Sequence, residues 1–231
     1  MPRNFMFTKE EIVQAALDLT RERGASAVTA RALGQKLGSS SRPIFSYFSN
    51  MAEVQTAVLQ ATQQLYQRYL AEDMAAGKYP PYKASGMAYI RFAKEEKELF
   101  RLLFMRDRTQ ETKEQAAEEL PPLIAILQKQ LHISESEAML FHLEMWVYVH
   151  GIATMIVTGY LNWEDDFISQ ALTDVYTGLK HRFSSSSKEA PSCSSFLYSL
   201  VIWLRRHRTG WPVVIPVTSE SMSLAFKIRS L

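Results

Sequence analysis

Residues 29–48, TARALGQKLGSSSRPIFSYF, decide the fold of this chain. Thr29 is a good N-cap, and the apolar residues Val28 and Leu33 lie where a hydrophobic staple would fix the start of a helix. Gly38 lies where helices commonly end with a left-handed residue. The spacing therefore predicts a short helix between Thr29 and Gly38.

A second short helix is predicted directly after this glycine turn. The three serines of residues 39–41 can cap it, and Pro43 falls in its first turn, where a missing N–H costs little. Ile44 and Phe48 are four residues apart and can be buried on one face. The stretch is typical of a helix-turn-helix, whose second helix fits the major groove of DNA.

Arg42 is the one long hydrogen-bond donor at the start of this second helix. It can grip the O6/N7 pair of a guanine or a phosphate. The alternative is that Arg42 is a solvated helix residue, and phosphate contacts outnumber base contacts in any case. Arg42 is therefore a candidate DNA contact of either kind.

Composition places the chain among folded proteins of the cytoplasm. Its 231 residues, of which 47% are hydrophobic, allow a substantial core. Cys193 is the single cysteine, which excludes an intramolecular disulfide framework and a multi-cysteine metal site. The N-terminus lacks a charged region followed by a long apolar run, which argues against a signal peptide.

The charges are unevenly distributed along the chain. Residues 1–50 hold seven Lys or Arg against four Asp or Glu, whereas residues 51–183 hold 13 against 18. Residues 184–231 are basic again, with six against two. A basic N-terminal segment and an acidic middle suit a nucleic-acid reader joined to a domain with another task.

Helical spacing runs through the first 131 residues. Capping-box pairs at Thr8 with Glu11 and at Asn50 with Glu53 predict a first helix that ends at Gly24 and a long helix over residues 51–74. Helices are also expected over residues 83–105, with a break near residues 95–97. A further helix is expected over residues 123–131, after a Pro-Pro pair. Residues 106–119 are expected to be a loop or an exposed helix. No strand signal precedes residue 184, so the fold class is all-α, with a three-helix head followed by a larger helical bundle.

Residues 145–163 contain no Asp, Glu, Lys or Arg. A membrane span needs about 20 predominantly apolar residues, so this alternative must be weighed. His150, Gly151 and Asn162 and the lack of a second such run favour a helix buried in a bundle or in a subunit interface. With the amphipathic helix expected over residues 165–183, helices around residues 139–161 and 165–183 are expected to form a homodimer, with no membrane partner.

Three domains follow from these patterns: residues 1–50, the head; residues 51–183, a helical domain for ligand binding and dimerisation; and residues 184–231, a tail that opens with a serine-rich linker-like segment. The sequence assigns the tail no function.

Residues 8–54 resemble the DNA-binding domain of the tetracycline-repressor-like (TetR) family of bacterial transcription regulators. The resemblance lies in the capped first helix, the T-A-x-x-L-G motif, the glycine turn and P-I-F-S-Y-F-S-N before the long helix. Trp146 with His150-Gly151 is similar to a Trp…His-Gly pattern of one branch of the family. The resemblance implies a cytoplasmic, ligand-released repressor that acts as a homodimer on a pseudo-palindromic operator in double-stranded DNA.

The resemblance also implies site residues. The expected DNA contacts are Thr29, Ser39, Ser40, Ser41, Arg42, Pro43 and Tyr47. Two positions depart from the family pattern, because Phe45 stands where Tyr is common and Met51 where Lys is common. These departures remove one hydroxyl and one cation from the expected DNA surface, so that binding would depend more on Thr29, Tyr47 and helix N-terminal amides.

Members of the family resemble one another in placing a small-molecule pocket inside the C-terminal bundle. For this chain an apolar or aromatic effector is expected. The aromatic and methionine residues of the bundle, with one histidine, are the candidates for its lining, although such residues are more often plain core: Phe92, Phe104, Trp146, Tyr148, His150, Met155 and Tyr160.

Other functional classes find less support. The chain has no Gly-rich phosphate loop, no H-E-x-x-H and no G-x-S-x-G motif, so neither an enzyme nor a cofactor is expected. His142 and His150 are more than two helical turns apart, which fits a metal site poorly. The remaining alternative is an all-helical structural or protein-interaction module without specific DNA binding.

Overall fold

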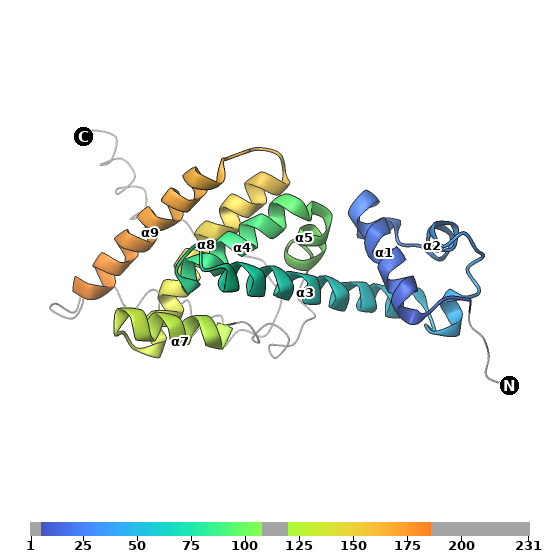
Figure 1. The fold of residues 1–231 in the computed structure, drawn as a ribbon, viewed down its shortest axis with the longest axis horizontal. Coiled ribbons are helices and arrows are strands. Elements are labelled where there is room, and N and C mark those ends of the chain that lie inside the picture. Colours follow the sequence, from blue (N-terminus) through green and yellow to red (C-terminus); the bar gives the residue numbers. More distant parts are fainter. Residues whose placement is uncertain (1–5, 108–119, 186–231) are drawn as a thin grey trace, which may run out of the picture. The chain divides into compact units, whose positions relative to one another are not determined.

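The computed structural model describes residues 6–107 and 120–185, and within these ranges every regular element is a helix (Figure 1). The expected all-α class is therefore confirmed. The 3₁₀ helices η1 (Ala25–Ala27) and η2 (Ile44–Ser46) accompany the α-helices of the N-terminal head. The predicted tail, apart from its first two residues, lies outside the described ranges.

Helix α1 (Lys9–Arg23) begins with the predicted capping box. The Thr8 hydroxyl accepts from the Glu11 amide at 3.1 Å, and the Glu11 carboxylate accepts from the Thr8 amide at 2.7 Å. Gly24 ends the helix with φ +81°, a conformation that favours glycine. Ile12 and Ala16 of α1 are fully buried and anchor the core of the head.

Helix α2 (Ala30–Lys36) starts where Thr29 predicts, because the Thr29 hydroxyl accepts from the Ala32 amide at 3.2 Å. Val28 and Leu33 are buried, and Gly38 has the expected positive φ, +65°. Gly34 lets the following turn approach closely, since a Cβ there would lie 3.0 Å from the backbone carbon of Ser40. Helix α2 and the turn that follows it are therefore in close contact at Gly34.

The second helix of the motif is shorter than the sequence predicts. Instead of an α-helix, the structure has the single 3₁₀ turn η2 between Pro43 and Tyr47. Pro43 supplies no N–H, and the serines before it have low helix propensity, so few residues remain to propagate a helix. Ile44 and Phe48 are nevertheless buried, as their spacing predicts, and the Phe48 amide donates to the Ile44 carbonyl at 3.1 Å.

Helix α3 (Met51–Ala76) joins the head to the helical domain. The Asn50 side chain accepts from the Glu53 amide at 3.0 Å, but Glu53 accepts from Ser49 and not from Asn50, so the predicted capping box is only half formed. Gly77 ends the helix in the left-handed conformation. Figure 1 shows α3 running from beside α1 to beside α4.

The predicted break near residues 95–97 is confirmed at Glu96, between α4 (Pro81–Glu95) and α5 (Lys97–Phe104). Helix α7 (Leu120–Leu131) holds the Pro-Pro pair in its first turn. Helix α8 (Glu135–Val157) starts at an unpredicted capping box, in which Ser134 pairs with Glu137. Helix α9 (Asp165–Ser185) closes the described chain.

The charge-free run of residues 145–163 is not a single helix, since α8 ends at Val157 and Gly159 turns the chain with φ +75°. Within the described residues, α8 is a helix long and apolar enough to cross a membrane by length and composition alone. It contacts α4, α5, α7 and α9, and eight of its residues are buried. A core helix of a soluble protein has the same properties.

Two hydrophobic clusters form the core. The larger one extends without interruption from Ile12 in α1 through Val54 in α3 to Phe92 in α4 and Ile152 in α8. The smaller one gathers α7 and the first half of α8 around Phe141. The boundary expected at residue 50 therefore lies inside one continuous core, so the head and the helical domain are packed together.

Candidate functional site

The head exposes the face that the sequence predicts to contact DNA. Thr29 is exposed at the start of α2, and Ser40, Arg42 and Ser46 are exposed in the turn after α2, where Ile44 and Phe48 are buried. Phe45 is the exception, with 46% of its surface exposed. The turn before η2 and η2 itself thus form a small exposed patch. The patch holds hydroxyl groups, one guanidinium and one aromatic ring.

Local hydrogen bonds order the serines of this patch. The Ser40 hydroxyl accepts from the Arg42 amide at 3.4 Å, and the Ser39 amide donates to the Gly34 carbonyl at 2.9 Å. Ser41 accepts through its carbonyl from the Ile44 amide at 3.2 Å. The serines therefore shape the turn. The Ser39 hydroxyl donates to the Met6 sulfur at 3.7 Å, whereas the Ser40 hydroxyl, which accepts from Arg42, keeps its proton to donate to a phosphate oxygen.

The other expected contacts lie before α2 and on both sides of η2. Thr29 uses one lone pair of its hydroxyl for the cap of α2, which leaves its proton to donate. Pro43 precedes η2, and Tyr47 follows it, half-buried. Arg31, which the sequence analysis did not single out, is exposed in the first turn of α2, two residues after Thr29. In the sequence, only its position on the polar face of the predicted helix indicated that Arg31 is exposed.

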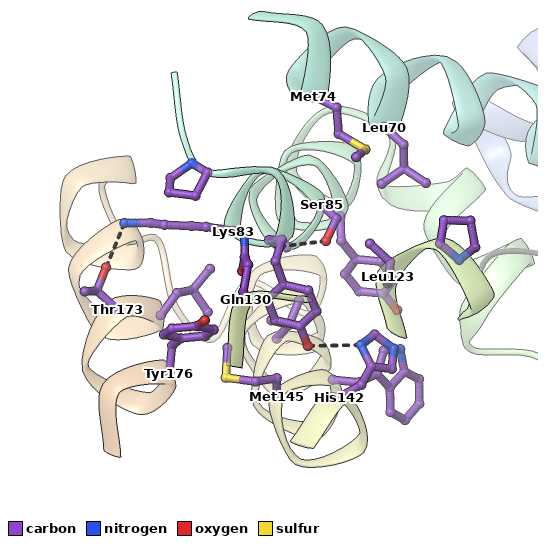
Figure 2. Close-up of a pocket in the computed structure, with 18 of the residues that line it drawn as sticks. Leu70, Met74, Lys83, Ser85, Leu123, Gln130, His142, Met145, Thr173 and Tyr176 are labelled. Atoms are coloured by element: carbon purple, nitrogen blue, oxygen red, sulfur yellow. Dashed lines mark hydrogen bonds between the residues drawn. The ribbon is translucent and has the colours of Figure 1, made fainter. Parts of the chain in front are cut away.

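A cavity of about 930 Å³ opens in the helical domain between α3, α4, α7, α8 and α9 (Figure 2). Its described walls are mainly apolar and aromatic. They include Leu70 and Met74 of α3, Leu123 of α7, Met145 of α8 and Tyr176 of α9. This volume lies in the upper part of the range typical of small-molecule sites.

Of the seven expected effector-site residues, Trp146 lines this cavity and the other six do not. Phe92 is fully buried, and Phe104 packs against Tyr66 and Tyr89, two aromatic residues of the cavity wall, at ring-centroid distances of 5.1 and 4.7 Å. These phenylalanines form the layer behind the wall. Tyr148 packs against the larger core cluster, whereas Met155 and Tyr160 are exposed.

His150 lies in an aromatic stack beside the cavity. Its ring stacks on Trp146 with centroids 4.9 Å apart, and its Nδ1 is 2.8 Å from the Tyr89 hydroxyl. Burial lowers the pKa of His150, which favours the neutral imidazole. The structure therefore gives His150 a packing and hydrogen-bonding role behind two residues of the wall.

His142 lines the cavity itself, with its Nδ1 3.0 Å from the Tyr82 hydroxyl. Burial lowers the pKa of His142 and raises that of Tyr82, so both groups are neutral near pH 7. Figure 2 shows His142 at the right of the view and Thr173 at the left, where the Nζ of Lys83 donates to the Thr173 hydroxyl at 2.8 Å.

The sequence analysis missed most of the wall. It named His142 only as a poor metal ligand. The polar wall residues that it did not name come from α3, α4, α7 and α9: Tyr66, Gln67, Tyr82, Lys83, Ser85, Tyr89, Gln130, Thr173, Tyr176, Thr177 and Lys180. Tyr82 and Tyr89 of α4 pair with His142 and His150 of α8, and only the fold reveals this pairing. Within the described ranges, no cluster of His, Cys, Asp or Glu could hold a metal ion.

The fold and the two sites define a class: an all-α protein with a helix-turn-helix head, packed on a helical domain with an internal cavity. Residues 12–58 match the family model described as bacterial regulatory proteins, tetR family, and residues 82–175 match the tetracyclin repressor-like C-terminal domain. The chain belongs to the TetR family of DNA-binding transcriptional regulators. No curated protein matches it.

Proposed function

We propose that this protein is a ligand-released repressor that acts as a cytoplasmic homodimer on a pseudo-palindromic operator. The observation that carries the proposal is the course of α3. Its first half supplies Val54 and Val58 to the core that it shares with the head, and its second half supplies Leu70, Ala71 and Met74 to the cavity wall. A ligand that displaces the second half of α3 therefore acts on the element that carries the head.

The proposal requires two states with different spacings of the heads. In the DNA-bound dimer, the two η2 segments enter successive major grooves about 34 Å apart. A ligand shifts the operator equilibrium only as far as it binds one spacing better than the other. The effector therefore favours the spacing that does not match the operator, and the repressor dissociates.

Dimerisation is supported by apolar side chains left exposed on α8 and α9. Trp146 and Val147 of α8 are 41% and 60% exposed, and Phe167 of α9 is 54% exposed. Large exposed apolar patches mark interaction surfaces in soluble proteins, and two helices from each protomer form a four-helix interface. Sedimentation velocity of the purified protein tests this point, since a monomer at micromolar concentration contradicts it.

DNA binding by the head is tested with the operator selected by the purified protein from random duplexes. Arg42→Ala is expected to weaken operator binding roughly tenfold or more, whether Arg42 contacts a base or a phosphate, and Tyr47→Phe is expected to weaken it less. Arg68→Ala removes the same charge from an exposed position of α3 in the helical domain and serves as the matched control. Binding of the selected duplex no tighter than random DNA would contradict the proposal.

Ligand release is tested by titrating apolar and aromatic compounds against a labelled operator complex. A compound that binds tightly to the free protein is expected to lower operator affinity. Replacement of Leu123 by Trp, which narrows the cavity from α7, is expected to weaken the ligand and leave operator binding intact. If every tight binder leaves operator affinity unchanged, the ligand-switch part of the proposal is wrong.

A further inference from the structure

The turn at η2 is followed by a long stretch of chain without a cation. Residues 43–67, which include η2 and the first half of α3, contain no Lys or Arg. Arg42 is therefore the last basic residue before the side of the turn that leads into α3. Because cations that neutralise phosphates supply a large share of DNA affinity, a charge brought to this side by another helix would strengthen binding.

Lys9 of α1 brings an ammonium group to this side of the turn. Its Nζ lies 5.4 Å from the centroid of the Phe48 ring, which is within the range of a cation–π contact. Phe48, between η2 and α3, is buried, whereas Lys9 is exposed in the first turn of α1. The charge of Lys9 is therefore held at the surface, beside the junction of η2 and α3.

The two ends of α1 adjoin different parts of the molecule. At its C-terminal end, Arg21 pairs with Glu96, and a Cβ at Gly24 would lie 3.2 Å from Oε2 of Glu98 in α5. At its N-terminal end, Lys9 lies over the Phe48 ring. Lys9 is therefore at the end of α1 that adjoins the turn at η2, and not at the end that adjoins the helical domain.

The carboxylates near Lys9 are not its partners. In the part of the chain that the structure describes, Lys9 forms no ion pair, although Glu10 and Glu11 are its neighbours in sequence. Glu11 and Glu53 each accept a hydrogen bond from a backbone amide at the start of a helix. The Lys9 ammonium thus remains available to an anion outside these residues.

We propose that Lys9 contacts a phosphate of the DNA backbone beside the groove that the turn at η2 enters. This inference rests on the proposed DNA contact of the head and on no feature of the cavity. A phosphate supplies the counter-charge, and charge-assisted hydrogen bonds are stronger than neutral ones. Because Lys9 already lies over Phe48, it loses less side-chain freedom on binding than an unrestrained lysine.

The test measures how DNA affinity depends on salt, by fluorescence anisotropy with the selected operator and with a random duplex of the same length. Each neutralised phosphate contributes about −0.9 to the slope of log affinity against log salt concentration. Lys9→Gln is therefore expected to make this slope less steep by about 0.9 per protomer, or about 1.8 for a dimer. Since a phosphate contact carries no sequence information, both duplexes should lose the same factor, roughly tenfold or more near physiological salt.

Two further variants separate a phosphate contact from a packing role. Lys9→Arg keeps both the charge and a cation over the Phe48 ring, so it is expected to keep the salt slope. Arg23→Gln removes one charge from an exposed position at the other end of α1, about 21 Å away along the helix axis, and is expected to leave the slope unchanged. Thermal unfolding checks that the variants are folded.

Lysine acetylation of the unmodified full-length protein gives a second measurement, which remains decisive even if Lys9→Gln does not fold. Mass spectrometry compares the extent of acetylation at each lysine with and without DNA. Lys9 is expected to be protected by DNA, whereas Lys129, at an exposed position of α7 in the helical domain, is expected to be acetylated equally in both samples.

The outcomes separate this inference from the proposed function. An unchanged salt slope in Lys9→Gln, an equal loss in Lys9→Arg, or acetylation of Lys9 that DNA does not slow overturns the phosphate contact. If the selected duplex binds no tighter than random DNA, the proposed repressor is contradicted, while the slopes on random DNA still test Lys9. If neither duplex binds, both proposals are wrong.

Discussion

Arg21 of α1 holds Glu96, the residue between α4 and α5, through both carboxylate oxygens. Its Nε and Nη2 each donate to Glu96 at 2.9 Å, and Nη1 donates to Asp18 at 2.9 Å. The Glu96 carboxylate raises the pKa of Arg21 further, and the Glu96 side chain is only 13% exposed. This ion pair therefore connects α1 of the head to the C-terminal end of α4, a helix that lines the cavity.

A double-mutant cycle of Arg21→Ala and Glu96→Ala is expected to give a coupling free energy of about 1 kcal/mol, between that of exposed and of fully buried ion pairs. Urea unfolding of the four proteins measures it. The exposed pair Lys36–Glu22 within the head is the control, and its coupling is expected to be smaller. Equal coupling free energies in the two cycles would show that the Arg21–Glu96 pair stabilises the fold no more than an exposed ion pair does.

Gly34→Ala is expected to reduce both stability and operator affinity. The new Cβ would lie 3.0 Å from the backbone carbon of Ser40 and 3.1 Å from the Ser41 nitrogen, so the turn before η2 must shift. Forced repacking of this kind costs about 1–3 kcal/mol of unfolding free energy. Thermal and urea unfolding and operator titrations measure the two effects.

Gly178→Ala provides the matched control, because a Cβ at Gly178 in α9 meets nothing within 4 Å. This variant is expected to gain about 0.5–1 kcal/mol from helix propensity and to bind operator normally. If Gly34→Ala behaves in the same way, close packing at Gly34 does not fix the turn.

Two partly buried histidines of α8, His142 and His150, predict acid sensitivity. Burial lowers the pKa of His142 and His150 from the ordinary 6.5, so the unfolded chain binds more protons than the folded one as the pH falls below that value. The stability that their neutral forms provide is complete above about pH 6.5 and is lost as the pH falls toward the folded pKa values.

Unfolding free energies measured by urea between pH 7.5 and pH 5 check this, at pH values chosen to bracket the reference pKa of about 6.5. His142→Asn combined with His150→Asn is expected to flatten the slope below pH 6.5, because both groups that gain protons on unfolding are then removed. An identical slope in the double variant and the unmodified protein would assign the acid sensitivity to other groups.

Phe45→Tyr is expected to tighten operator binding a few-fold. The ring of Phe45 is 46% exposed on the patch proposed to contact DNA, so a hydroxyl added there can donate to a phosphate without disturbing the core. Because the added donor is neutral, the dependence of affinity on salt should stay the same. Fluorescence anisotropy at several salt concentrations measures both quantities, and an unchanged affinity would place Phe45 away from the backbone.

Local sequence was enough to predict most helix boundaries, because caps are local. Thr8, Thr29 and Asn50 each cap the helix that they were expected to start, and Gly38 and Gly77 have the left-handed conformation. The second helix of the motif was predicted to be too long. Pro43 was rightly expected near its start, but the lack of residues to propagate the helix after it was overlooked.

The cavity could not be predicted in the same way, because its wall depends on which faces of five helices converge. Aromatic content pointed to Phe92 and Phe104, which the fold places one layer behind the wall. Tyr82 and Lys83 at the start of α4 gave no signal by themselves. Only their positions opposite His142 on α8 and Thr173 on α9 bring them together.

The turn at η2 separates buried residues, which stabilise the fold, from exposed ones, and this separation affects how the protein can be engineered to bind a new operator. Ile44 and Phe48 hold the turn in the core, whereas Ser40, Arg42 and Phe45 are exposed. Substitutions at exposed positions usually change stability by less than about 0.5 kcal/mol. The outward positions can therefore be randomised as a library for new operator sequences while the inward ones are kept, with little loss of folded protein.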